Sequence, residues 1–130
     1  MAPMTPHILL TRPLPPLAAA RLATLGTVTL LESPSPVELA QAAQNADILL
    51  PTITDRIDST VLVPGSRLKL VANFGAGFEH IDLAAARAAG IPVTNTPDAL
   101  TEATAEIALL LMLMAARRAC LLYTSDAADE

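Results

Sequence analysis

Two glycines flank an alanine at Gly75-Ala76-Gly77, and this is the first segment whose residue types suggest chemistry. Because glycine has no side chain, a ligand can approach the backbone closely, and the peptide N–H groups can point toward an anion such as a carboxylate. A tight turn with positive φ at glycine explains the same residues without a ligand, and the motif alone favours that interpretation. A dinucleotide-binding fingerprint is excluded, because no third glycine follows at the required spacing.

The segment Thr101–Glu106 is a second candidate, because it opens the longest predicted helix. The first turn of a helix carries unpaired N–H groups and a partial positive charge, so it can bind phosphate or orient a cofactor. Thr104 lies one turn into this helix and would add a hydroxyl group. Simple capping of the helix by Thr101 is the alternative, and the spacing alone favours it.

His80 is the third candidate, since a histidine changes its charge near neutral pH and can act as an acid or a base. A capping or partly exposed histidine is more common, so we interpret His80 as structural. No Ser-His-Asp set, metal cluster or carboxylate pair can be assembled from the sequence. The single cysteine, Cys120, excludes a disulfide framework and a cysteine-based zinc site.

The elements that must position these residues follow from an alternation of short apolar runs with Ala/Leu-rich segments. We predict strands at 7–10, 27–31, 47–50, 68–74 and 91–95, and helices at 17–25, 36–45, 55–62, 83–89 and 102–118. The predicted N-caps are Ser35, Asp82 and Thr101, and the predicted C-caps are Gly26 and Gly90.

Five repeats of strand and helix predict an α/β protein with an open, doubly wound parallel sheet. Ligands of such sheets bind beyond the carboxyl ends of the strands. Two segments fall there, Pro51–Thr54 after the third strand and Gly75–Gly77 after the fourth. The sequence therefore places these two segments at the edge of the sheet where a ligand would bind.

Length and composition limit the class of protein. The 130 residues suffice for one domain of ordinary size, and 52% hydrophobic residues can form a core. A net charge of −5 argues against nucleic-acid binding. The longest uncharged apolar run, Ile107–Ala116, is about half of a membrane span. With no visible signal peptide, we expect a soluble cytoplasmic protein that binds neither nucleic acid nor membrane.

Residues Val71–Asp82 resemble the D-isomer-specific 2-hydroxyacid dehydrogenases, and within them the glyoxylate/hydroxypyruvate reductase branch most of all. The resemblance covers residues 7–119 and is specific, because several motifs occur in the family's order and spacing. The other matching segments are 8–13, 54–58, 90–97, 100–106 and 115–118.

The resemblance implies the incomplete, flavodoxin-like substrate domain of a two-domain dehydrogenase. Residues 1–100 would be part of the substrate-binding (catalytic) domain, and residues 101–119 an interdomain helix that leads to an NAD(P)-binding Rossmann domain. Residues 120–130 match nothing in the family, and one reading frame of a common transposase sequencing adapter encodes them. We expect natural sequence to end near Ala119; a genuine acidic tail is the alternative.

The family's reaction transfers hydride between NAD or NADP and a small 2-oxo acid, such as glyoxylate or hydroxypyruvate. By resemblance, the backbone of Ala76 and Gly77 would hold the substrate carboxylate, Thr52 and Ile53 would line the same pocket, and Thr104 would meet the nicotinamide. The family's catalytic arginine, glutamate and histidine match no residue of this chain. No catalytic residue and no metal ligand is therefore assigned, and we expect the chain alone to be inactive.

The resemblance also implies a homodimer, formed with the help of the helix Glu102–Arg118. An alternative is a non-catalytic, flavodoxin-like module that binds a 2-oxo acid or a dinucleotide, or that serves only in dimerisation. Nothing in residues 1–119 excludes this alternative.

Overall fold

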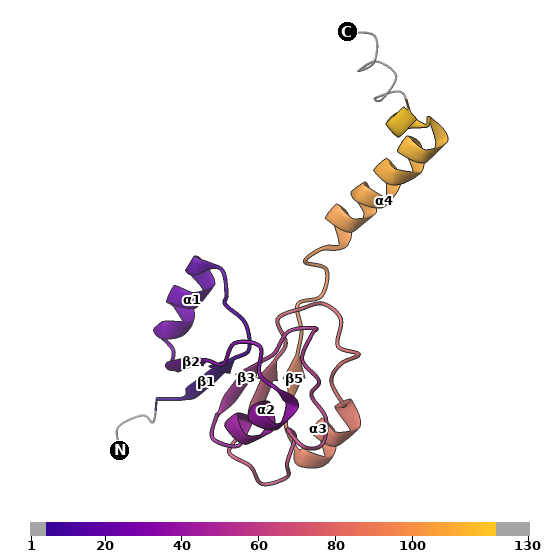
Figure 1. The fold of residues 1–130 in the computed structure, drawn as a ribbon. Helices are drawn as coiled ribbons and strands as arrows, with labels where there is room; N and C mark the ends of the chain where they lie inside the picture. The colour runs from indigo at the N-terminus through magenta and orange to yellow at the C-terminus, as the bar shows by residue number, and fades with distance from the viewer. Residues whose placement is uncertain (1–4, 122–130) are drawn as a thin grey trace. The chain divides into compact units, whose positions relative to one another are not determined.

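The computed structural model describes residues 5–121, and its chain divides into two compact units, Met1–Pro97 and Asp98–Glu130 (Figure 1). The first unit contains every strand of the described residues, and the second contains one long helix. The expectation for residues 120–130 falls almost wholly outside the described part of the chain.

Five parallel strands form one sheet in the order β2-β1-β3-β4-β5. This is the strand order of flavodoxin-like proteins, so the predicted fold class is confirmed. The fourth and fifth strands in chain order are shorter than predicted. Their bounds are β1 His7–Leu10, β2 Thr27–Leu30, β3 Ile48–Leu50, β4 Leu70–Ala72 and β5 Val93–Thr94.

Four helices follow the strands: α1 Pro16–Ala23, α2 Pro36–Ala43, α3 Leu83–Ala89 and α4 Thr101–Ala116. Local chemistry sets the ends of the middle two. Ser35 and Glu38 form a reciprocal capping box at the start of α2. Asp82 accepts the Ala85 N–H at the start of α3, and Gly90 ends that helix with φ of 69°. These three predicted caps are confirmed.

Two other predicted caps are wrong. Thr101 is the first residue of α4 and not its cap, since Leu100 occupies the cap position and supplies no side-chain hydrogen bond. Gly26 does not cap α1, which ends at Ala23 and has Thr24 as its C-cap. A Cβ at Gly26 would lie 2.3 Å from the carbonyl oxygen of Pro6, so glycine is needed there for the close approach of two backbones.

The predicted helix 55–62 is also wrong, because this segment consists of turns and one isolated bridge between Ile57 and Ile81. Asp58 accepts hydrogen bonds from both the N–H and the hydroxyl of Thr60. Such local side-chain bonds stabilise turns at the expense of helix.

The main hydrophobic cluster lies on one face of the sheet. Register pairs Leu9 with Leu49 and Leu49 with Val71, and all three are buried. They pack with buried residues of α2 and α3, which lie on the same side of the sheet in Figure 1. α1 contains no buried residue, so it contributes little to this core. One strongly packed face is enough to hold the carboxyl ends of the strands in place.

No helix among residues 5–121 is long and apolar enough to cross a membrane.

Candidate substrate-binding loops

Two loops meet at the carboxyl edge of the sheet, one after β3 and one after β4. The Phe74 N–H donates to the Pro51 carbonyl oxygen over 2.9 Å. A Cβ placed on Gly75 would lie 3.2 Å from Ile53 Cγ2, so the loops are in direct contact there. The structure therefore brings Thr52 and Ile53 beside Gly75–Gly77, as the strand order requires.

A buried carboxylate holds the first loop. Asp55 is only 7% exposed, and its Oδ2 accepts the Thr52 N–H at 2.7 Å and the Thr52 hydroxyl at 3.1 Å. The same oxygen accepts the hydroxyl of Thr11, at the end of β1, at 2.5 Å. With these donors bound to it, Asp55 fixes Thr52 and leaves the neighbouring Ile53 67% exposed at the loop surface.

Two asparagines hold the second loop through its carbonyl oxygens. Asn73 Nδ2 donates to the oxygens of Gly75 at 3.1 Å and Gly77 at 2.7 Å. Asn95 Nδ2 donates to the Ala76 oxygen at 2.7 Å. The Thr96 N–H also donates to the Gly75 oxygen, at 3.0 Å. Each of the three consecutive carbonyl groups is thus occupied.

The peptide N–H groups of the same loop remain available. Within residues 5–121, no group accepts a hydrogen bond from the N–H of Ala76 or Gly77. Neither Gly75 nor Gly77 has positive φ, so the interpretation as a positive-φ turn is wrong. At Gly75 glycine allows the close approach of Ile53 instead. Free N–H groups next to one another can bind a carboxylate.

His80 is half-buried behind this loop, and its Nε2 lies 3.1 Å from Asn73 Oδ1. This contact agrees with the structural interpretation of His80, and it gives the residue a defined partner. The Nδ2 of Asn73 already faces two carbonyl oxygens, so its Oδ1 must face the histidine as an acceptor. A proton on His80 Nε2 would satisfy this acceptor.

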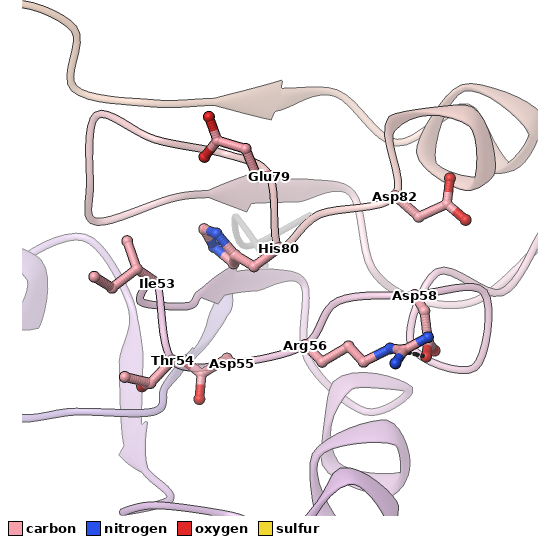
Figure 2. A pocket seen from close by; sticks show the side chains of 8 residues that line it. All are labelled: Ile53, Thr54, Asp55, Arg56, Asp58, Glu79, His80 and Asp82. Carbon is pink, nitrogen blue, oxygen red and sulfur yellow. Dashed lines mark hydrogen bonds and ion pairs between the residues drawn. The ribbon is translucent and has the colours of Figure 1, made fainter.

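A hollow of about 450 Å³ opens beside the two loops, and Figure 2 shows its lining. Ile53 and His80 line it, together with an excess of carboxylates over cations. Most of these carboxylates already have partners: Asp55 as above, Asp58 with Arg56 at 3.1 Å, and Asp82 in its cap. This acidic lining does not favour an anion in the hollow. The lining residues are Ile53, Thr54, Asp55, Arg56, Asp58, Glu79, His80 and Asp82.

Thr104 belongs to the second unit, in the first turns of α4, where its N–H donates to the Leu100 oxygen at 2.9 Å. A hollow at the start of this helix includes Glu102 and Glu106 in its lining, and Thr104 is not part of it. Two carboxylates beside the helix N-terminus offset the partial positive charge that would attract a phosphate. Among the described residues, no group of three or more His, Cys, Asp and Glu side chains could hold a metal ion.

Sequence reasoning missed the residues that shape the loops, namely Asn73, Asn95 and Asp55. A signal was present for the asparagines, because each directly follows a strand at the carboxyl edge. Polar residues at that edge merit attention in any doubly wound sheet.

Residues 8–130 match the model of the D-isomer specific 2-hydroxyacid dehydrogenase catalytic domain. The chain is 36% identical over 118 residues to the glyoxylate reductase of Thermococcus onnurineus, covering 88% of this chain and 35% of the relative.

Solved structures show the same fold. The TT0316 protein of Thermus thermophilus is 41% identical with a TM-score of 0.77, and the match covers 87% of this chain and 37% of that one. The NADPH-dependent glyoxylate/hydroxypyruvate reductase of Sinorhizobium meliloti, in complex with NADP and malonate, is 29% identical with a TM-score of 0.68, covering 85% and 34%. The chain therefore spans about a third of the length of these relatives.

Proposed function

The chain belongs to the D-isomer specific 2-hydroxyacid dehydrogenase family, and we propose that it supplies the substrate-carboxylate site of an enzyme that reduces a small 2-oxo acid. Glyoxylate and hydroxypyruvate are the proposed substrates, with the corresponding 2-hydroxy acids as products. Relatives named as glyoxylate reductases support this assignment.

One observation carries the proposal. The N–H groups of Ala76 and Gly77 have no acceptor among residues 5–121, while the carbonyl groups of the same loop are all occupied. An arrangement with only donors available binds an anion and not a cation. A carboxylate is the anionic group that every 2-oxo acid carries, so this loop would fix the acid end of the substrate.

The neighbouring loop would hold the rest of the substrate. Ile53 contacts Gly75 and presents an apolar surface beside the N–H groups, so it limits the size of the substituent on the keto carbon. Thr52 is fixed by Asp55 and would line the same pocket. Small substrates such as glyoxylate fit a pocket bounded in this way.

The cofactor is proposed to be NAD or NADP, which supplies the hydride when bound. The described residues contain no dinucleotide-binding glycine fingerprint, so this chain would touch the cofactor only through Thr104. Residues 1–100 would form part of the substrate domain, and residues 101–119 the helix that connects it to the cofactor domain. The chain by itself would not turn over substrate.

A chimera tests the proposal. Residues 1–119 of this chain, followed by the corresponding remainder of the Thermococcus onnurineus glyoxylate reductase, should reduce glyoxylate with NADH or NADPH. Absorbance at the reduced nicotinamide band measures the rate. The chain alone should show no turnover, and glycolaldehyde should be a poor substrate of the chimera because it lacks the carboxylate.

The outcome that contradicts the proposal is equally clear. A folded chimera that binds the reduced cofactor but reduces no 2-oxo acid would favour the non-catalytic binding module. Equal rates with glyoxylate and glycolaldehyde would show that the loop does not bind a carboxylate.

The exposed helix α4 of the second unit supports an additional role in dimerisation. Every residue of α4 is exposed, and Ile107–Ala116 is a run of ten uncharged residues. A helix that is apolar on all sides is normally buried against other protein. We propose that a second copy of the chain covers it in the complete protein. Replacing Leu110 with Glu should convert a dimeric chimera to monomers in sedimentation, and an unchanged dimer would contradict this role.

A further inference from the structure

We infer that Asn73 and Asn95 are positioning residues that aim the N–H groups of Ala76 and Gly77 at the substrate, and that His80 holds the Asn73 amide in place. The inference rests on the proposed function, because the substrate carboxylate is the group at which the N–H groups are aimed. Neither asparagine touches the substrate in this account.

The argument starts from the planarity of the peptide unit. In a trans peptide the C=O and the following N–H point in opposite directions, and the described residues contain no cis peptide. The Gly75 carbonyl therefore sets the direction of the Ala76 N–H, and the Ala76 carbonyl sets that of the Gly77 N–H. A donor that binds either oxygen from the protein side turns the corresponding N–H outward.

The asparagines are placed to do this. Asn73 Nδ2 binds the Gly75 oxygen and so directs the Ala76 N–H, and Asn95 Nδ2 binds the Ala76 oxygen and so directs the Gly77 N–H. The second hydrogen of Asn73 Nδ2 binds the Gly77 oxygen at 2.7 Å, which fixes the next peptide as well. One buried amide thus controls two of three consecutive peptide units.

Asn73 is itself held firmly. It is 3% exposed, and its backbone N–H donates to the Thr94 carbonyl oxygen at 2.8 Å, beside the end of β5. The side-chain amide could still rotate by 180° about its last bond, which would turn Oδ1 toward two carbonyl oxygens and repel them. The hydrogen bond from His80 Nε2 to Oδ1 favours the working orientation.

The first experiment measures kinetics in the chimera. Replacing Asn73 with Leu keeps the branching of the side chain at Cγ and removes its donors. We expect the KM for glyoxylate, and the inhibition constant of malonate, to rise about tenfold or more, since misplaced donors weaken carboxylate binding. The KM for the reduced cofactor should stay within about twofold of the parent, because the cofactor does not contact this loop.

A matched control separates positioning from stability. Asp47 is another buried polar residue of the sheet, but it lies before β3, at the opposite edge. Asp47→Asn should lower stability without a change in the KM for glyoxylate. If Asp47→Asn raises this KM as much as Asn73→Leu does, the effect is general destabilisation and the inference is wrong.

Histidine variants supply a second test that does not depend on Asn73 variants folding. His80→Gln keeps a donor and should leave the KM for glyoxylate within about twofold, whereas His80→Leu loses the donor and should raise it about threefold to tenfold. Asn95→Leu should also raise it. Equal kinetics of His80→Gln and His80→Leu would overturn the role of His80.

A spectroscopic test uses the 130-residue chain itself. The ring ¹⁵N shifts of His80 should report a proton on Nε2, and the amide resonances of residues 75–78 should move in Asn73→Leu and not in Asp47→Asn. A proton on Nδ1, or unmoved resonances in Asn73→Leu, would overturn the inference. An inactive chimera with these expected spectra would refute the proposed function and leave the loop geometry intact.

Discussion

The two edges of the sheet use buried carboxylates in different ways. At the amino edge, Asp47 accepts two hydrogen bonds from Arg67 at 2.7 and 3.1 Å, one from the His7 N–H at 2.8 Å, and lies 3.6 Å from Lys69 Nζ. At the carboxyl edge, Asp55 has no cationic partner among residues 5–121, and within this range it accepts only from the Thr52 and Thr11 donors. Asp47 is thus part of an ion cluster, whereas Asp55 fixes the conformation of a loop.

This difference shows which edge is open to a ligand. Arg67 and the His7 N–H hold the pKa of Asp47 well below its usual range, so the carboxylate at the amino edge is already paired and offers little to a further cation. At the carboxyl edge, amide and hydroxyl groups fix the backbone and leave the N–H groups of Ala76 and Gly77 free. We therefore expect the amino edge to contribute to stability, and we propose the carboxyl edge as the binding edge.

The largest effect is expected from Asp55→Ala, which removes the carboxylate that holds the loop after β3. It leaves the buried Thr11 hydroxyl and the Thr52 N–H without their acceptor, and should lower the free energy of unfolding by about 3 kcal/mol. Urea denaturation of the chain measures this loss. In the chimera, the KM for glyoxylate should rise because Thr52 and Ile53 move.

Asp58→Ala is the matched control for this variant, since Asp58 lies in the same segment but binds Arg56 and Thr60 instead. Its KM for glyoxylate should equal that of the parent. An Asp55→Ala chimera with unchanged KM would show that the first loop does not bear on the substrate.

Asp47→Asn should have the next largest effect, and on stability alone. The neutral amide weakens the bonds from Arg67, whose side chain can regain water, so we expect a loss of about 2 kcal/mol in urea denaturation. Arg67→Met should lower the urea midpoint by less, because the Arg67 side chain is already 45% exposed. A raised KM for glyoxylate in either variant would remove the distinction between the edges.

The contribution of Asp47 should disappear in acid. A carboxyl group whose folded pKa is lowered stabilises the fold above its unfolded pKa, and that stability is lost as the pH falls through and below it, from about pH 4 downward. Urea midpoints of the parent and of Asp47→Asn should therefore converge between about pH 4 and pH 2. A constant gap between them over this range would contradict the ion cluster.

The sequence predicted the sheet because apolar runs and caps are local signals. The doubly wound parallel sheet followed from the alternation of strand and helix, and Ser35, Asp82 and Gly90 act at helix ends as expected. The helix predicted at 55–62 is wrong, because the N–H groups of this segment donate to oxygens in tight turns or in distant parts of the chain. The order of residue types in this segment could not reveal that Asp55 would turn inward to Thr11.

The sequence predicted where the candidate site lies, but not the hydrogen bonds that shape its loops. Spacing put Thr52 and Gly75–Gly77 at one edge, and the structure has them there. The glycines indicated free N–H groups but suggested positive φ, which neither residue adopts. What frees the N–H groups is a pair of asparagines from two strands, 22 residues apart in the sequence, and single-residue patterns do not report such a pair.

The smallest effect is expected from Ser35→Ala, and it sharpens the comparison within the carboxyl edge itself. Ser35 lies after β2, at the same edge as the binding loops, but its hydroxyl serves only the capping box with Glu38. Loss of such a cap costs about 1 kcal/mol, measured by urea denaturation of the chain. The KM of the chimera for glyoxylate should not change, because no bond links Ser35 to either loop. If it does change, the whole edge responds as one unit, and the role assigned to the two asparagines becomes a property of the edge and not of those residues.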